Sequence, residues 1–398
     1  MSKKHRTALW LALACLFLFA LMHVLQGSSP LRVSAYNTYT LQAMRWRQGE
    51  TALAGDYPHL ELAIYEGKYY VSFPPVPTIP IYLLTYVFGD RVPETPLVQM
   101  YALGACLALY YLLARRMAYG KAALWAFLSC FASSLLPLLQ NGAVWYQAQV
   151  LALLLTVWAM ERMDADQPTA GLLLYALAVG CRPFNALYGP VLMLLYLRKH
   201  PPAVKAIRRM APGIALGLVV AAAYAWYNMI RFDNPLEFGH NHLPEFSFQG
   251  GVQFSLSHVG NNARTFLWGL PFEYTDTNSL KLKVFGFSLF LANPLLLCLA
   301  GWALLSVICR RMTVEKGLVL LGFAAHATLL LCHRTGGGFQ YGARYWMDCL
   351  PWAFLWMGLE RRDDLPRMRK WTEGISLALL VVGLGMAAYG ATVVLLPG

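Results

Sequence analysis

Long apolar segments alternate with short polar ones along most of the chain. Several apolar runs reach about 18 residues, the length at which an α-helix crosses a hydrocarbon layer of ~30 Å. The pattern predicts an all-α polytopic membrane protein with about eleven transmembrane helices. The predicted spans are 8–26, 96–114, 122–139, 143–160, 170–181, 183–197, 211–230, 284–308, 317–332, 346–359 and 372–395.

One further apolar run, Val76–Phe88, contains prolines and is too short for a regular span. Such a run is typical of an interfacial or re-entrant segment. Treating it as a span would invert every later loop and place the basic segment 198–209 outside. We therefore keep Val76–Phe88 on the outer side.

Basic residues follow this topology. Of the 32 Lys and Arg, 20 fall in the predicted cytoplasmic segments, as the positive-inside rule expects. The N-terminus is then cytoplasmic, and the first apolar run, after Lys3, Lys4 and Arg6, is expected to be an uncleaved anchor. The net charge of +12 is spread over these short loops, so we predict membrane lipids as partners and no nucleic acid.

Composition narrows the class of protein. With 58% hydrophobic and 13% charged residues, the chain is neither disordered nor typical of a soluble protein. Its eight cysteines lie in or beside apolar runs without a CxxC pair, which indicates small buried residues. The absence of GxxxxGK[ST] and GxGxxG motifs argues against an ATP-driven pump or a nucleotide-sugar enzyme.

Three outer segments are long enough to fold: 27–95, 231–283 and 333–345. The first is predicted to be an extracytoplasmic loop with interfacial helices, and the second a large extracytoplasmic loop. Inner loops are too short for a catalytic domain. We therefore predict a single integral membrane domain over 1–398 in the cell membrane, with its active site on the extracytoplasmic face.

The stretch Ser28–Pro80 holds the first candidates for chemistry. NTYTLQAMRW is expected to form a short amphipathic helix at the membrane surface, and the carboxylates of Asp56, Glu61 and Glu66 follow. A carboxylate here is either a general base or a ligand of a divalent cation. The alternative is a surface loop whose acidic side chains are only solvated. The sequence itself requires no cofactor.

YEGKYYVSFPPVP predicts a turn at Gly67 followed by extended chain, because each proline disfavours helix in the residue before it. Lys68 follows the turn directly. Tyr69 and Tyr70 either stack on a sugar or lipid headgroup, or are ordinary aromatic residues of the membrane interface.

Basic residues at the outer boundaries are candidate phosphate ligands, since arginine forks suit phosphate oxygens. Arg182 and Arg344 adjoin proline or glycine turns, and Arg231 and His333 begin outer segments. The structural alternative is that such arginines only reach to the membrane surface. The spacing of His240, His242, His258 and Glu237 matches no standard zinc site, so no metal ligands are predicted.

Five segments together resemble the GT-C membrane glycosyltransferases, especially the protein mannosyltransferase-like, family 39-like group. They are YNTYTLQAMRWRQGE, ELAIYEGKYYVSFPPVPTIPIYLL, GCRPFNALYGP, WYNMIRFDNPLEFGHNHLPEF and GGFQYGARYWMDCLP. The resemblance implies a sugar donor linked to polyprenyl phosphate, an acceptor glycan, lipid or protein, and a carboxylate in the first outer loop.

Relatives often place Asp or Asp-Glu at the start of that loop, where this chain has Tyr36 and Asn37. A D-x-A-x-Y-x-G-K-Y-Y pattern reads here as E-L-A-I-Y-E-G-K-Y-Y. The resemblance therefore assigns the catalytic role to Glu61, with Asp56 in reserve. Two other functions stay open: a transporter or flippase for a lipid-linked glycan, and a noncatalytic assembly factor for envelope polymers.

Overall fold

The computed structural model describes residues 1–247, 252–360 and 366–394. The chain divides into two compact units that are interleaved along the sequence. Unit 1 comprises 1–28, 102–140 and 254–397, and unit 2 comprises 29–101 and 141–253. Helix α4 (Glu94–Leu113) contributes its first part to unit 2 and the rest to unit 1. The single domain over 1–398 stays a prediction.

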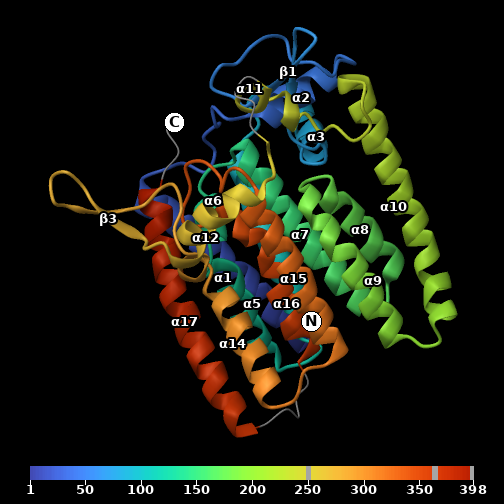
Figure 1. Cartoon of the computed structure of the whole chain (residues 1–398), viewed down its shortest axis with the longest axis vertical. Helices are drawn as coiled ribbons and strands as arrows, with labels where there is room; N and C mark the ends of the chain where they lie inside the picture. The colour runs from blue at the N-terminus through green and yellow to red at the C-terminus, as the bar shows by residue number, and fades with distance from the viewer. Residues whose placement is uncertain (248–251, 361–365, 395–398) are drawn as a thin grey trace. The chain divides into compact units, whose positions relative to one another are not determined.

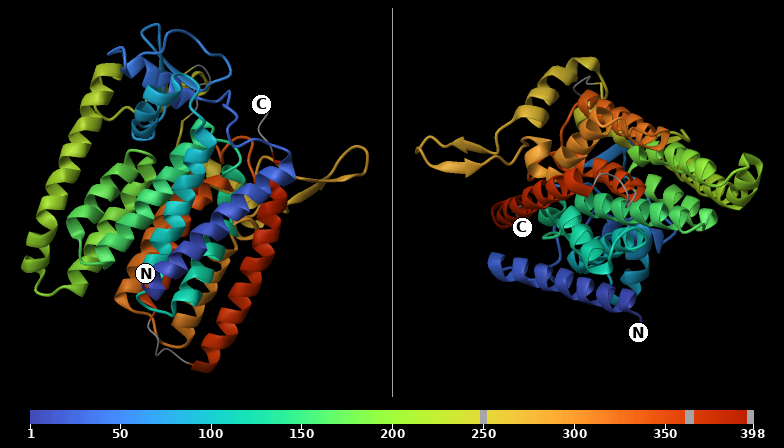
Figure 2. Two further views of the ribbon diagram at one scale, coloured as in Figure 1. Left: turned by 180° about the vertical axis from the view of Figure 1, so that it is seen from behind. Right: turned by 90° about the horizontal axis from the view of Figure 1, so that it is seen from below.

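Unit 1 is a set of apolar helices with one short β-hairpin, whose strands extend away from the helices (Figures 1 and 2). Among the described residues, four short 3-10 or α-helical elements connect the longer helices. Its elements other than α4 are α1 (Lys3–Gln26), α5 (Tyr119–Phe131), α6 (Leu135–Leu138), η3 (Leu256–His258), α12 (Val259–Trp268), β3 (Phe272–Tyr274), β4 (Leu280–Leu282), α13 (Leu289–Ala292), α14 (Pro294–Ile308), α15 (Val314–Cys332), η4 (Arg344–Cys349), α16 (Leu350–Leu359) and α17 (Pro366–Val393).

Unit 2 combines a compact segment from the predicted outer loop 27–95, called the outer segment below, with four helices that run alternately up and down (Figure 1). The outer segment packs around buried apolar residues such as Tyr39, Leu62 and Val144. The elements of unit 2, with the start of α4, are α2 (Thr38–Trp46), β1 (Leu62–Tyr65), β2 (Lys68–Val71), α3 (Thr78–Phe88), α7 (Val144–Asp164), α8 (Pro168–Val179), η1 (Pro183–Leu187), α9 (Tyr188–Lys199), α10 (Ala203–Phe232), η2 (His240–His242) and α11 (Pro244–Ser247).

Hydrophobicity predicted a helical membrane protein, and this is confirmed in its general form. Among the described residues, five helices are long and apolar enough to cross a membrane: α1, α4, α10, α15 and the part of α17 from Lys370 onward. The number of about eleven is not confirmed. The predicted span 122–139 breaks between α5 and α6, and α8 and α14 are apolar but short.

The described residues are mostly helical but also form two antiparallel β-hairpins, so the prediction of an all-α chain is corrected. In the first, Leu62 pairs with Val71 and Tyr65 with Lys68. The predicted turn at Gly67 is confirmed, because Glu66 and Gly67 both have positive φ, 49° and 74°. Positive φ at both central positions is the geometry of a tight two-residue hairpin loop. The predicted loop 231–283 includes 248–251, which lie outside the described residues.

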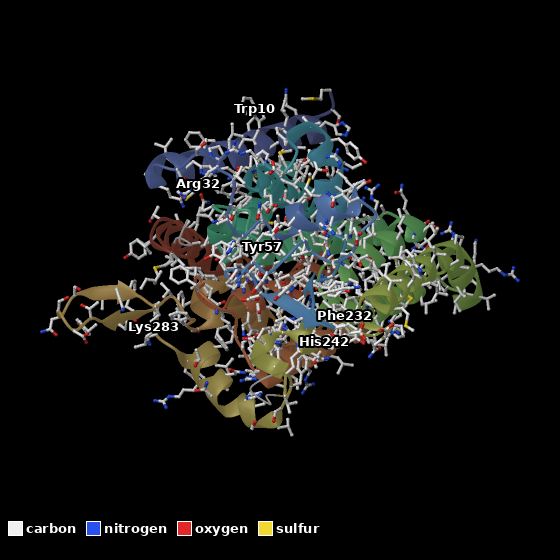
Figure 3. All side chains as sticks on the ribbon, turned by 90° about the horizontal axis from the view of Figure 1, so that it is seen from above. Trp10, Arg32, Tyr57, Phe232, His242 and Lys283 are labelled. Atoms are coloured by element: carbon white, nitrogen blue, oxygen red, sulfur yellow. The ribbon has the colours of Figure 1, made fainter. Side chains whose placement is uncertain are left out.

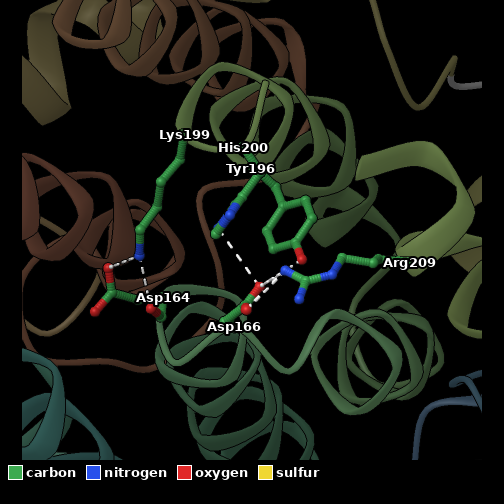
Figure 4. Close-up of polar contacts among 6 residues, drawn as sticks. All are labelled: Asp164, Asp166, Tyr196, Lys199, His200 and Arg209. Carbon is green, nitrogen blue, oxygen red and sulfur yellow. Dashed lines mark hydrogen bonds and ion pairs between the residues drawn. The ribbon is translucent and has the colours of Figure 1, made fainter. Parts of the chain in front are cut away.

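A polar cluster joins the C-terminal ends of α7 and α9 to the start of α10 (Figure 4). Asp166 accepts a hydrogen bond from Tyr196 Oη at 2.6 Å and pairs with Arg209 Nη1 at 2.8 Å and His200 Nε2 at 3.5 Å. Lys199 Nζ lies 3.2 Å from Asp164 Oδ1. These contacts fasten the α7–α8 turn to the α9–α10 connection.

This cluster predicts an acid-dependent loss of stability. The hydrogen bond from Tyr196, followed by the charges of Arg209 and His200, holds the pKa of Asp166 below its usual value of 3.8. An acid whose pKa is lower in the folded state than in the unfolded state stabilises the folded protein at pH values above its unfolded-state pKa. This stabilisation is lost as the pH falls through the folded-state pKa. We expect Asp166→Asn to lower the thermal unfolding temperature at pH 7. The difference in unfolding temperature between this variant and the wild type should become smaller below about pH 4. An equal difference at pH 7 and pH 3 would contradict this assignment.

Candidate functional site

The short helix α2 is fastened by buried hydrogen bonds from its polar side. Gln42 Nε2 donates to Tyr227 Oη at 2.9 Å, and Trp46 Nε1 donates to the same oxygen at 3.1 Å. Gln42 Oε1 accepts a hydrogen bond from Thr78 Oγ1. The predicted helix over NTYTLQAMRW is thus present, and it is tied to α3 and to the end of α10.

Glu61 lies directly before β1, and its side chain is exposed. Trp145 Nε1 donates a hydrogen bond to Glu61 Oε2 at 2.8 Å, and Ser72 Oγ donates to the Glu61 carbonyl at 3.0 Å. The Trp145 ring packs at 5.2 Å from the ring of Tyr36, whose carbonyl accepts from Val144 N at 3.1 Å. The carboxylate is therefore open to solvent and oriented by the start of α7.

The other outer-loop candidates differ in exposure. Asp56 and Lys68 are exposed, in the loop before β1 and at the start of β2. Tyr69 is half-buried, and its carbonyl accepts from Leu53 N at 2.8 Å. Tyr70 is buried and packs edge-on against Phe232 at 5.3 Å. The hairpin thus presents Lys68 outward and turns Tyr70 inward.

Arg231 has the surroundings of a structural residue. Its side chain is 2% exposed, and Nη1 and Nη2 donate to the Val71 carbonyl and to Asn228 Oδ1, each at 2.9 Å. The guanidinium also lies over the ring of Tyr227 at 4.1 Å. These contacts join β2 to α10. Contact of Arg231 with substrate stays a prediction.

Arg182 lies between α8 and η1 and is half-buried. It is an electrostatic neighbour of the fully buried Tyr39. Burial raises the pKa of the Tyr39 phenol well above its ordinary value, and the charge of Arg182 opposes that shift. A positive charge is therefore placed beside α2, on the same unit as Glu61.

His333 and Arg344 belong to unit 1. His333 is buried, with Nδ1 at 2.7 Å from the Thr335 carbonyl and its ring 5.9 Å from that of Tyr345. Arg344 is 4% exposed; its amide donates to Gln340 Oε1 at 2.9 Å, and its guanidinium lies over the ring of Tyr345 at 5.0 Å. Tyr345 thus neighbours both predicted ligands.

The histidines after α10 make packing contacts. The ring of His242 stacks on Phe232 at 5.3 Å and lies 4.8 Å from Tyr65, as Figure 3 shows for the labelled pair. Glu237 accepts from Gly239 N and Asn241 Nδ2, each at 2.6 Å. Its carboxylate therefore closes the turn after α10.

Glu94, at the start of α4, is a buried acid that sequence reasoning missed. It is 0% exposed, and its Oε1 accepts a hydrogen bond from Thr40 Oγ1 of α2. An acidic residue in the first turn of a helix is common because it complements the helix dipole. That local pattern gave no reason to expect burial, since the partner lies 54 residues away.

We predict that Trp145 positions Glu61. Trp145→Phe keeps a large ring but removes the N–H that orients the carboxylate. Hydrogen bonds to charged groups contribute about 1.5–3 kcal/mol, so we expect kcat of a reaction that uses the Glu61 carboxylate as its base to fall by about tenfold or more, with KM nearly unchanged. A purely structural role would instead lower the amount of folded protein at unchanged specific activity. Tyr36→Phe, which keeps the ring, is the control.

No family model matches the chain, and no curated protein matches it by sequence. Solved structures do match in fold. The oligosaccharyltransferase AglB of Archaeoglobus fulgidus, in complex with an inhibitory peptide and a dolichol-phosphate, aligns with TM-score 0.56 at 12% identity, over 98% of this chain and 56% of AglB. ArnT of Cupriavidus metallidurans bound to undecaprenyl phosphate aligns with TM-score 0.53 at 12% identity, over 97% of this chain and 76% of ArnT.

Both similar proteins are GT-C fold glycosyltransferases, so the fold expected from the resemblance is confirmed. The chain spans about half the length of AglB. At such low identity the likeness defines the fold of this multi-pass membrane protein and leaves its reaction to be argued from the residues.

Proposed function

We propose that the protein is a membrane glycosyltransferase. It transfers a sugar from a polyprenyl-phosphate donor to an acceptor glycan, lipid or protein on the extracytoplasmic face. The observation that carries the proposal is Glu61: an exposed carboxylate, oriented by Trp145, in the outer segment of a chain with the GT-C fold. The similar proteins bound to dolichol-phosphate or undecaprenyl phosphate support a donor of this class.

The reaction is a substitution at the anomeric carbon. The acceptor oxygen forms the new bond to that carbon while the bond from carbon to the phosphate oxygen breaks, and polyprenyl phosphate leaves with the bonding pair. Glu61 takes the acceptor's proton, and Asp56 is the reserve for that role. Positive side chains are needed for the leaving phosphate, and Lys68 and Arg182 of unit 2 are the proposed ligands. For Arg344 of unit 1, contact with the phosphate stays a prediction.

Profiling the lipid intermediates and envelope glycans of a deletion strain tests this function. We expect the sugar-loaded polyprenyl phosphate to accumulate and one glycan, glycolipid or glycoprotein to lose a sugar. Complementation with Glu61→Gln should leave both changes in place. Normal profiles in the deletion strain would argue against the proposal.

The second candidate is movement or assembly of lipid-linked glycans without transfer. It is favoured by Tyr36 and Asn37, which stand where the resembling family often has an acid. Such a protein would bind the same donor through its basic residues and would not need a base. Unimpaired complementation by both Glu61→Gln and Asp56→Asn would favour this function over transfer.

The proposed orientation can be tested by labelling. We expect the N-terminus and the α9–α10 connection to be cytoplasmic and the segment after α10 to be extracytoplasmic, because basic residues concentrate in 198–209. Cysteines introduced at the exposed positions Ala203 and Leu236 are suitable reporters. An impermeant thiol reagent should label position 236 in intact cells and position 203 only after permeabilisation. The reverse result would invert the topology.

A further inference from the structure

A group of buried polar atoms in unit 2 lacks hydrogen-bond partners among the residues that the structure describes. They are Glu94 Oε2 and the hydroxyl oxygens of Tyr39 and Tyr101. Glu94 and Tyr39 are 0% exposed and Tyr101 is 8% exposed. Buried polar groups are almost always satisfied, by protein or by a bound molecule. Three unsatisfied atoms of this kind therefore point to a ligand.

The three side chains are neighbours. Glu94 acts electrostatically on both Tyr39 and Tyr101, and so does the buried Cys181. Glu94 and Tyr101 are seven residues apart, which places them on one face of α4. Tyr39 precedes Thr40, the residue that bonds the other oxygen of Glu94. The unsatisfied atoms thus come from the facing sides of α2 and α4.

Packing holds Glu94 in place. A Cβ added to Gly142 would lie 2.5 Å from the Glu94 carbonyl carbon and from its Cβ, so the segment before α7 is in close contact with the start of α4. Gly142 N also donates to Thr95 Oγ1 at 3.0 Å. The packing of Gly142 fixes the Glu94 backbone, and the hydrogen bond from Thr40 fixes Glu94 Oε1. Glu94 Oε2 therefore cannot move to find a protein partner and needs a bound group to satisfy it.

The chemistry of the group defines the ligand. A carboxylate oxygen accepts hydrogen bonds, and phenol hydroxyls both donate and accept them. An apolar group would leave all three atoms unsatisfied. An O–H group complements the set. We propose that Glu94, Tyr39 and Tyr101 form a hydroxyl-binding site between α2 and α4.

Two sources can supply that hydroxyl: an ordered water molecule or a hydroxyl of the donor sugar. The second source rests on the proposed function and deepens it, because it would place sugar recognition beside Arg182, the proposed phosphate ligand next to Tyr39. The first source is independent of the proposed function.

Removal of single hydroxyls tests the shared chemistry. Tyr39→Phe and Tyr101→Phe keep the rings, so they report on one oxygen each. Deleting a hydroxyl that has no partner should leave stability unchanged or raise it, whereas deleting one that binds an O–H group should lower it. If water supplies the O–H group, we expect each variant to lower the apparent Tm of the detergent-purified, lipid-free protein by about 2 °C. If the sugar supplies it, Tm should fall only when the hexose-bearing lipid is bound. Glu94→Gln is a second probe, and Tyr86→Phe, at an exposed tyrosine of α3, is the control.

Binding measurements then distinguish the sources. Affinities are measured for a polyprenyl-phosphate hexose and for the same polyprenyl phosphate without sugar. If the hydroxyl belongs to the sugar, the preference for the hexose-bearing lipid should fall by about tenfold in Tyr39→Phe or Glu94→Gln. If it belongs to water, Tm should fall while that preference stays constant.

Variants with unchanged or raised Tm and an unchanged preference would overturn the hydroxyl-binding site. A wild-type protein that binds neither lipid would refute the donor assignment instead, and the Tm comparison would still decide whether the site binds water. Failure of the proposed function and failure of this inference therefore give different results.

Discussion

Replacing Glu61 with glutamine is expected to slow sugar transfer by about 10²–10⁴-fold, the usual effect of losing a general base. This corresponds to about 3–5 kcal/mol of activation free energy. Glutamine keeps the shape of the side chain and still accepts a hydrogen bond from Trp145, so the protein should fold, insert and bind donor normally. The rate of release of polyprenyl phosphate measures the effect.

Two matched variants separate the role of Glu61 from that of local charge. Glu66→Gln makes the same change at an exposed residue of the hairpin turn and should leave the rate within about twofold of the wild type, because surface charges interact weakly. Asp56→Asn should have a smaller effect than Glu61→Gln. A rate that survives Glu61→Gln and collapses in Asp56→Asn would move the catalytic role to Asp56.

Removing the Arg231 side chain is expected to have the largest effect on stability. Arg231→Met would leave the Val71 carbonyl and Asn228 Oδ1 without their donors, at a cost of about 1–3 kcal/mol for each unsatisfied group. The free energy of unfolding should therefore fall by about 2–6 kcal/mol. Lysine would not rescue it fully, because an ammonium group lacks the fork that reaches both acceptors.

Thermal unfolding and donor affinity, measured on the same preparations, test this role. If Arg231 is a structural residue, both Arg231→Met and Arg231→Lys should have a lower Tm than the wild type, while the folded fraction of each variant still binds donor. A variant with the Tm of the wild type and with no affinity for polyprenyl phosphate would instead make Arg231 a phosphate ligand, as the sequence alone suggested. Arg264→Met, in α12, is a control for loss of charge outside the outer segment.

Local patterns predicted the elements that are defined by short-range physics. The amphipathic stretch after Asn37 forms α2, and Glu66 and Gly67 form the tight turn between β1 and β2. The proline-containing run Val76–Phe88 contains α3, an 11-residue helix. Such a helix is only about 16 Å long, well short of a hydrocarbon core, which agrees with its exclusion from the spans.

Contacts between distant residues could not be predicted from these patterns. Thr40 and Glu94 are 54 residues apart, and Val71 and Arg231 are 160 apart. Apolar composition alone also did not show that the run 122–139 is interrupted: α5 ends at Phe131 and α6 begins at Leu135. Burial of Tyr70 and Arg231 likewise depends on the packing of the hairpin against α10.

The most direct test of the central claim is a transfer assay with purified protein in proteoliposomes. A polyprenyl-phosphate hexose labelled in the sugar is supplied together with a membrane extract as the source of acceptor. The wild type should release one polyprenyl phosphate for each labelled sugar that appears in acceptor, and Glu61→Gln should do so at least about a hundredfold more slowly. Label that stays attached to polyprenyl phosphate with the wild type, or equal rates for the two proteins, would contradict the account.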